Sequence, residues 1–149
     1  MAHSIWVLNG PNLNRLGKRE PEVYGHTTLA QIQDMCAVAA GAASLVFHQS
    51  NFEGELVEWI HDAIDEKASA IVINPAGLTF SSVSIFDALK MFPRPVIELH
   101  ISNIHRRESI YHHSLVSGVA TAIIAGMGAD GYRLAVEAAL MLAARGSHR

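Results

Sequence analysis

Glu98 and His100, separated by one residue, carry the clearest chemical signal in the sequence. They lie in an apolar segment that reads as a strand, and side chains two positions apart leave the same face of a strand. A carboxylate beside an imidazole fixes the tautomer of the ring and favours its protonated form, which is the form that a general acid needs. The pair therefore predicts a general acid, although a purely structural histidine would have the same spacing.

A second candidate group lies in residues 17–25, where a glycine at each end flanks a charged segment. Glycines at the ends of a loop can act as hinges, so this segment could be a lid. Tyr24 in this lid would act as a base only as a phenolate, which a neighbouring cation must stabilise. Arg19 could supply that cation. The spacing alone also leaves open a plain solvated loop.

Other motifs favour neither a nucleotide nor a metal. Residues 126–131 match G-x-G-x-x-G, but a dinucleotide site also needs an acidic residue about 20 positions on, at the end of the next strand. No such strand is expected there, so the glycines predict a tight turn and close helix packing. The nine histidines show no firm ligand spacing and have a single cysteine for company. We therefore expect no metal and no cofactor.

Alternating short apolar runs and helical patterns must position these groups. Apolar runs separated by helices predict a parallel sheet covered on both faces. Five such units in 149 residues predict a single α/β domain with a flavodoxin-like, doubly wound, five-stranded sheet. We expect strands at 5–9, 45–49, 70–74, 96–101 and 120–125, and irregular loops at 10–26 and 75–80. We expect helices at 29–40, 53–66 and 131–145, and one more between Ser81 or Ser82 and Pro93. Thr27 or Thr28 should cap the first of these helices, and Ser81 or Ser82 the one that ends before Pro93.

The ends of three predicted strands are polar where the strands themselves are not. In doubly wound sheets, ligands bind beyond the carboxyl ends of the strands, where the strand order reverses. Residues 9–14, 74–77 and 98–102 all fall at such ends. We therefore expect these three segments to converge on one site.

Composition excludes several classes of function. Half of the residues are apolar, 17% are charged and the formal net charge is −3, which argues against disorder and against nucleic acid or an anionic membrane as the main partner. No apolar stretch approaches the roughly 20 residues of a membrane span, and we expect no secretory signal. Cys36 is the only cysteine, so an internal disulfide is excluded and a reduced, cytoplasmic setting fits best.

Four blocks of motifs together resemble those of the type II dehydroquinases. They follow one another in order from about Ile5 to the last helix, so the set is far more specific than any one motif. The blocks are 9–17 with Arg19-Glu-Pro21 and Tyr24-Gly25; Gln49-Ser-Asn51 with Glu53-Gly54; Asn74-Pro75 with Leu78-Thr79; and 98–103 with Arg107-Glu108 and His112-His-Ser114.

The resemblance implies a cofactor-free anti elimination of water from 3-dehydroquinate through an enolate. By this likeness, Tyr24 removes the proton alpha to the ketone and Arg19 activates it. His100, beside Glu98, protonates the leaving hydroxyl. Asn12 holds a water that stabilises the enolate, an electrostatic role that often dominates catalysis. The reaction could serve aromatic biosynthesis or quinate breakdown.

The resemblance also implies how the substrate is held. Asn74 and the backbone N–H groups of Ile101 and Ser102 match the site for the substrate carboxylate and a neighbouring hydroxyl, and Arg107 is expected among the substrate-binding residues. Asp87 matches an aspartate that completes the site from an adjacent subunit. Members of the family assemble as trimers that build dodecamers.

Two positions depart from the family's usual pattern. Phe80 stands where a histidine is usual, and Tyr111 stands where an arginine is usual. Both usual residues serve the end of the substrate that bears the distal hydroxyls. Two alternatives therefore stay open: a paralogue that dehydrates a related cyclic β-hydroxy ketone, and a binding relative without turnover. Retention of Arg19, Tyr24 and His100 together speaks against the second.

Overall fold

Five parallel strands form one sheet in the computed structural model, which describes residues 2–146. The strand order is β2-β1-β3-β4-β5. This order reverses direction between β1 and β3, and it confirms the predicted flavodoxin-like, doubly wound single domain. The strands are β1 Ser4–Asn9, β2 Ser44–Gln49, β3 Ala70–Asn74, β4 Val96–His100 and β5 Ala122–Ala125.

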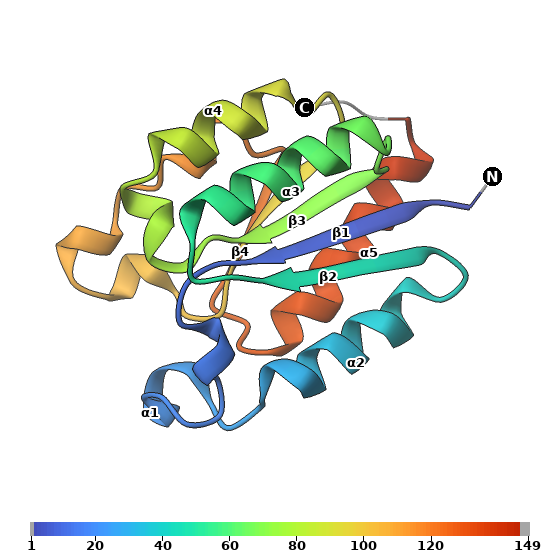
Figure 1. The fold of residues 1–149 in the computed structure, drawn as a ribbon. Coiled ribbons are helices and arrows are strands. Elements are labelled where there is room, and N and C mark those ends of the chain that lie inside the picture. Colours follow the sequence, from blue (N-terminus) through green and yellow to red (C-terminus); the bar gives the residue numbers. More distant parts are fainter. Residues whose placement is uncertain (1, 147–149) are drawn as a thin grey trace.

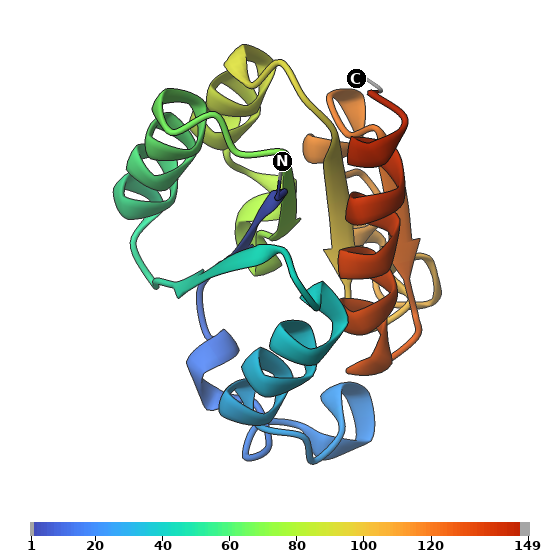
Figure 2. The same ribbon diagram turned by 90° about the vertical axis from the view of Figure 1, so that its right-hand side faces the viewer.

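Two pairs of helices cover the two faces of the sheet (Figures 1 and 2). Helices α2 (Leu29–Ala40) and α5 (Asp130–Ala144) pack on one face, and α3 (Glu53–Asp65) and α4 (Val83–Met91) pack on the other. The short helix α1 (Pro21–Tyr24) lies beyond the carboxyl ends of the strands (Figure 1). None of the helices in the described part of the chain is long and apolar enough to cross a membrane.

Successive side chains of β1 are buried in two separate hydrophobic cores. Ile5 and Val7 are buried with residues of α2 and α5, whereas Trp6 and Leu8 are buried with residues of α3 and α4. A strand that is buried on both sides is apolar along most of its length. This is why the strand runs in the sequence show no polar alternation.

Side-chain caps decide where two helices begin. The Thr28 hydroxyl accepts a hydrogen bond from the Gln31 N–H (3.2 Å), and the Gln31 side chain accepts one from the Thr28 N–H (2.9 Å), which is a complete capping box. The Ser82 hydroxyl accepts from the Ile85 N–H (3.0 Å) at the start of α4. Of the candidate caps, Thr28 and Ser82 are therefore the ones used.

Several predicted boundaries were wrong. Residues 10–26 are not a single irregular loop, because they contain a 3-10 turn, η1 (Leu13–Arg15), and helix α1, which Pro21 starts with its fixed φ. Residues 75–80 also form a 3-10 turn, η2 (Ala76–Phe80). Strand β4 ends one residue early, β5 begins at Ala122 and α5 begins one residue early. Thr121, just before β5, bonds to Val96 through both its N–H and its side-chain oxygen.

The glycine motif before α5 serves the turn and the packing. Gly126 and Gly128 have φ of 89° and 61°, in the left-handed region that favours glycine. A Cβ at Gly131 would lie 3.0 Å from the Leu99 side chain, so the helix packs close to β4. These observations support the structural interpretation of the motif.

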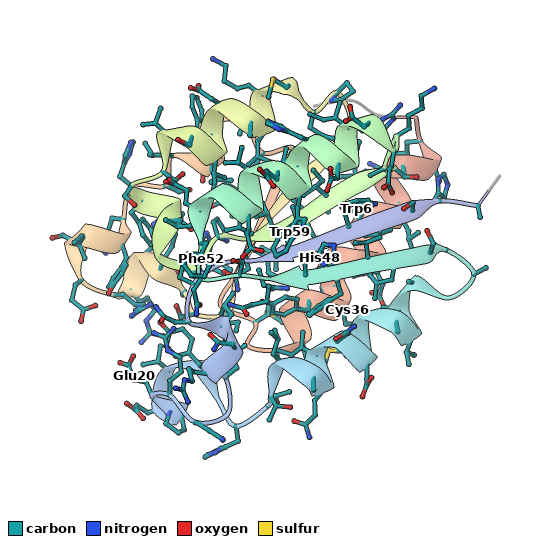
Figure 3. All side chains as sticks on the ribbon, viewed as in Figure 1. Trp6, Glu20, Cys36, His48, Phe52 and Trp59 are labelled. Carbon is teal, nitrogen blue, oxygen red and sulfur yellow. The ribbon has the colours of Figure 1, made fainter. Side chains whose placement is uncertain are left out.

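His48 on β2 lies between two tryptophans (Figure 3). Its ring stacks on Trp59 with centroids 4.5 Å apart and meets the edge of Trp6 at 6.1 Å. Burial lowers the pKa of His48, and the negative charge of Asp62 only partly opposes this effect. The folded chain therefore favours the neutral ring.

We predict that this histidine contributes a pH-dependent component to stability. The unfolded chain binds a proton near pH 6.5 that folded His48 rejects, so the free energy of unfolding should fall as the pH drops through and below that value. Replacement of His48 by Phe should keep the stacking and reduce this dependence. Urea unfolding between pH 5 and 7.5 would measure it, with His61→Gln, an exposed histidine of α3, as the control. Equal pH dependence in wild type and His48→Phe would contradict the assignment.

Candidate active site

One pocket at the carboxyl edge of the sheet gathers the predicted segments. The loop after β1, the lid residues, the turn after β3 and the end of β4 all contribute to its wall. Gly10 makes this convergence possible, since a Cβ there would lie 2.3 Å from the Pro75 carbonyl oxygen. Among the predicted site residues, those that line the pocket are Asn12, Arg19, Tyr24, Asn74, Phe80, His100, Ile101, Ser102, Arg107 and Tyr111.

Glu98 and His100 form a buried pair at the end of β4. Nε2 of His100 lies 2.5 Å from a Glu98 carboxylate oxygen, and the Glu98 side chain has no exposed surface. The hydroxyls of Ser114 (2.7 Å) and Ser117 (2.5 Å) also donate to this carboxylate. Burial alone would raise the pKa of Glu98, but the bonds from His100, Ser117 and Ser114 outweigh it and the pKa lies below its ordinary value.

This arrangement defines the chemistry that His100 can perform. Because a charged Glu98 holds Nε2 as a donor, Nδ1 is the ring nitrogen left for a ligand in the pocket. A proton on Nδ1 would therefore be available to a ligand in the pocket. Sequence reasoning missed Ser114 and Ser117 as partners of Glu98, since both come from an irregular segment with no periodic pattern.

The Tyr24 hydroxyl lies between two guanidinium groups. Arg19 Nη2 donates to the phenolic oxygen at 3.2 Å, and Arg107 Nη1 donates to it at 3.0 Å. Both guanidinium groups also lie over the Tyr24 ring, 4.2 and 5.5 Å from its centroid. A phenolate oxygen would keep both donors, and their charges would stabilise it.

Arg107 has a position that the sequence did not reveal. We expected it among the substrate-binding residues, and it does line the pocket, but its hydrogen bonds go to Tyr24 and, at 3.4 Å, to the Ser102 hydroxyl. Its guanidinium group also lies 4.1 Å from the centroid of the Tyr111 ring. Arg107 thus connects residues 17–25 to the segment that follows β4 through these hydrogen bonds.

Asn12 reaches the pocket through an unusual backbone conformation. Its φ of 72° is in the left-handed region, which asparagine tolerates better than most residues. The Asn51 side chain accepts a hydrogen bond from the Asn12 N–H (2.9 Å), and Gln49 donates in turn to the same Asn51 oxygen. The second motif block therefore supports the loop that carries Asn12.

Three donors at the sheet edge could hold an anion. The N–H groups of Ile101 and Ser102 follow β4, line the pocket and have no hydrogen-bond partner within residues 2–146. Asn74 ends β3 with only 3% of its surface exposed, and its amide nitrogen donates to Tyr132 at 2.9 Å. One N–H of that amide remains for a ligand.

One part of the pocket wall is aromatic. The rings of Phe80 and Tyr111 meet edge to face with centroids 5.3 Å apart. Phe80 also stacks towards His100, at 6.4 Å between centroids. This wall offers a ligand one hydroxyl group, on Tyr111, and is otherwise apolar.

Asp87 does not line this pocket within one chain. It lies exposed on α4, so any contribution to the pocket must come from another subunit. No group of three or more His, Cys, Asp or Glu side chains within residues 2–146 is placed to hold a metal ion.

A family model and known relatives of this chain point to the same family. A family model described as dehydroquinase class II matches residues 3–140. A protein of Rhodopseudomonas palustris named 3-dehydroquinate dehydratase is 50% identical over 138 residues, which is 91% of each chain. One of the same name from Cereibacter sphaeroides is 52% identical over 148 residues, covering 98% of this chain and all of its relative.

Solved structures agree with the sequences. The type II dehydroquinase of Propionibacterium acnes superposes with a TM-score of 0.85 at 41% identity, over 97% of this chain and 98% of the other. The type II dehydroquinase of Butyrivibrio crossotus has a TM-score of 0.90 at 35% identity, over 93% of this chain and 98% of the other. With its fold, motifs and relatives in agreement, this chain belongs to the class II dehydroquinase family.

Proposed function

We propose that this chain is a 3-dehydroquinate dehydratase that eliminates water from 3-dehydroquinate to give 3-dehydroshikimate. One observation carries the proposal: a tyrosine held by two guanidinium groups and a histidine held by a buried carboxylate line the same pocket. These are a positioned base and a positioned acid. The name shared by relatives about 50% identical to this chain supports the same reaction.

Proton removal comes first in the proposed mechanism. Tyr24, as a phenolate stabilised by Arg19 and Arg107, takes the proton alpha to the ketone. The electrons of the broken C–H bond move to the ketone oxygen and form an enolate. A water held by Asn12 donates a hydrogen bond to the enolate oxygen, which stabilises the charge where it develops.

Loss of the hydroxyl follows. The enolate electrons return to form the carbon–carbon double bond as the C–O bond breaks. Nδ1 of His100 gives its proton to the leaving oxygen, which departs as water, and Glu98 keeps its hydrogen bond to Nε2 throughout. Acid–base chemistry is sufficient for both steps, so the mechanism uses no cofactor.

The substrate carboxylate binds to the Asn74 amide and to the N–H groups of Ile101 and Ser102. We propose that residues 17–25 close over it as a lid. Gly17 and Gly25, at the two ends, have φ of 88° and 80°, which support hinge positions because other residues rarely adopt them. Closure would bring Tyr24 and Arg19 onto the substrate.

We also propose that the enzyme works in the cytoplasm as a trimer-based dodecamer, with Asp87 completing the pocket of an adjacent subunit. The exposed position of Asp87 on α4 is consistent with that role. Ile123 on the edge strand β5 is 52% exposed and Val83 at the start of α4 is 60% exposed. Such exposed apolar side chains favour burial between subunits.

A second candidate function rests on the aromatic wall. Phe80 and Tyr111 cannot pair two substrate hydroxyls as hydrogen-bonding side chains would, and an unpaired buried hydroxyl costs about 1–3 kcal/mol. The same acid and base could instead serve a cyclic β-hydroxy ketone without polar distal groups. The pocket therefore supports the reaction more firmly than it supports one substrate.

Incubation with 3-dehydroquinate tests the function directly. Purified protein should form the conjugated enone product, which absorbs in the ultraviolet. The variant Tyr24→Phe should lower turnover by at least about a hundredfold, because it removes the general base. Glu22→Gln, in the same short helix, is the matched control. Near-normal turnover in Tyr24→Phe would remove Tyr24 from the mechanism, and no enone from wild type would contradict the substrate.

Removal of the acid should separate the two steps. In His100→Ala the enolate can still form and return, so exchange of the alpha proton with solvent deuterium should outlast dehydration. Proton NMR of the substrate in deuterated water would follow exchange, and ultraviolet absorbance would follow the product. An equal fall in both rates would withdraw the role of proton donor from His100.

Restoring polar side chains should raise efficiency on 3-dehydroquinate. The double variant Phe80→His with Tyr111→Arg should increase kcat/KM by roughly tenfold or more, if both side chains form hydrogen bonds to the distal hydroxyls. Steady-state kinetics of wild type and variant would measure the change. High efficiency in wild type with no gain in the variant would show that Arg106, His112 or another group already pairs those hydroxyls.

A further inference from the structure

A chain of buried hydrogen bonds runs behind the pocket and uses a tyrosine that the mechanism does not involve. Tyr132 of α5 is completely buried, and its hydroxyl lies 2.7 Å from Asn9 Oδ1 and 2.9 Å from Asn74 Nδ2. The two asparagines end β1 and β3 and are register partners in the sheet. Their amides therefore meet on one hydroxyl from a helix.

Backbone groups at the two ends of this chain fix its direction. Asn9 Nδ2 donates to the His48 carbonyl oxygen (3.0 Å), and a carbonyl can only accept. The amide oxygen of Asn9 must then face Tyr132. At the other end, the Ala76 N–H donates to Asn74 Oδ1 (3.2 Å), and an N–H can only donate. The amide nitrogen of Asn74 must then face Tyr132.

Only a hydroxyl can join these two ends, because the middle group has to donate to one amide and accept from the other. Tyr132 does both, and burial raises its pKa, so the hydroxyl keeps its proton. A phenylalanine could do neither. With Oδ1 and one N–H of Asn74 both engaged, the second N–H is the donor that remains for a ligand in the pocket.

We propose that Tyr132 is a positioning residue that, together with the Ala76 N–H, holds the Asn74 amide so that an N–H, and not the carbonyl oxygen, faces the substrate carboxylate. The proposal rests on the proposed function only in naming the ligand as a carboxylate. A reversed amide would turn its oxygen towards the anion and replace attraction by repulsion. This chain of hydrogen bonds thus links helix α5 to the charge preference of the pocket.

Binding measurements can isolate this role from turnover. The probes are shikimate, a reduced analogue of the proposed product, and its methyl ester, which lacks the negative charge. Dissociation constants from NMR titration would be compared for wild type, Tyr132→Phe and Val136→Ala. Val136 is buried one turn further along α5 in the same core, and it takes no part in the chain of hydrogen bonds. It therefore controls for loss of packing alone.

In Tyr132→Phe, shikimate should bind about tenfold more weakly, as expected from the loss of one hydrogen bond to a charged group. The ester should bind within about twofold of its wild-type affinity, and Val136→Ala should bind both probes as wild type does. In turnover of 3-dehydroquinate by Tyr132→Phe, KM should rise by a larger factor than the factor by which kcat falls. Unchanged shikimate affinity in Tyr132→Phe, or equal weakening for both probes, would overturn the proposal.

A second variant covers the case in which Tyr132→Phe fails to fold. Asn9→Leu keeps the branched shape of the side chain and removes the acceptor of the Tyr132 hydroxyl, so that this hydroxyl is no longer held in place to accept from the Asn74 amide. The same selective loss of shikimate affinity is expected, and its absence would overturn the proposal. A wild type that binds shikimate but does not turn over 3-dehydroquinate would contradict the proposed function and leave the orientation of Asn74 as a separate result.

Discussion

Glu98 lies inside the sheet with no exposed surface, and its charge is tolerable only because His100, Ser114 and Ser117 all donate to it. The loop that follows β4 must therefore return past the strand to bring both serines to one carboxylate. The same bonds hold the His100 ring and leave Nδ1 for the pocket. A single buried carboxylate thus couples the path of the chain after β4 to the orientation of the His100 ring.

The amides of Asn9 and Asn74 are also buried polar groups that need hydrogen-bond partners. They lie at the carboxyl edge of the sheet, on the face opposite Glu98. Parallel strands carry both into the interior, where an unpaired amide would be costly, and Tyr132 pairs them. The polar side chains beneath the pocket are therefore hydrogen-bonded to one another. Tyr24, by contrast, ends the short helix α1 between Gly17 and Gly25, and two guanidinium groups donate to its hydroxyl. In the proposed mechanism, the base belongs to the proposed lid and the acid belongs to the sheet edge.

Local sequence patterns were sufficient to predict the five parallel strands and the helices between them, because those features depend on residues close together in the chain. The same patterns limited the caps to Thr27 or Thr28 and to Ser81 or Ser82. The spacing of Glu98 and His100 likewise placed them on one face of a strand. Contacts between distant segments left no such pattern. Arg107 meets Tyr24 across 83 positions and Tyr132 meets Asn74 across 58. The structure of residues 10–26 was also missed, since α1 depends on Pro21 and on a left-handed Glu20.

In the proposed mechanism, Tyr24 and His100 act on one substrate from opposite sides, so the elimination must be anti. The most direct measurement uses 3-dehydroquinate carrying deuterium at only one of the two alpha hydrogens, with the product examined by mass spectrometry. Deuterium placed anti to the leaving hydroxyl should be lost to solvent, and deuterium placed syn to it should be retained in the enone. Loss of the syn deuterium, or equal loss of both, would contradict the assignment of base and acid to these two residues.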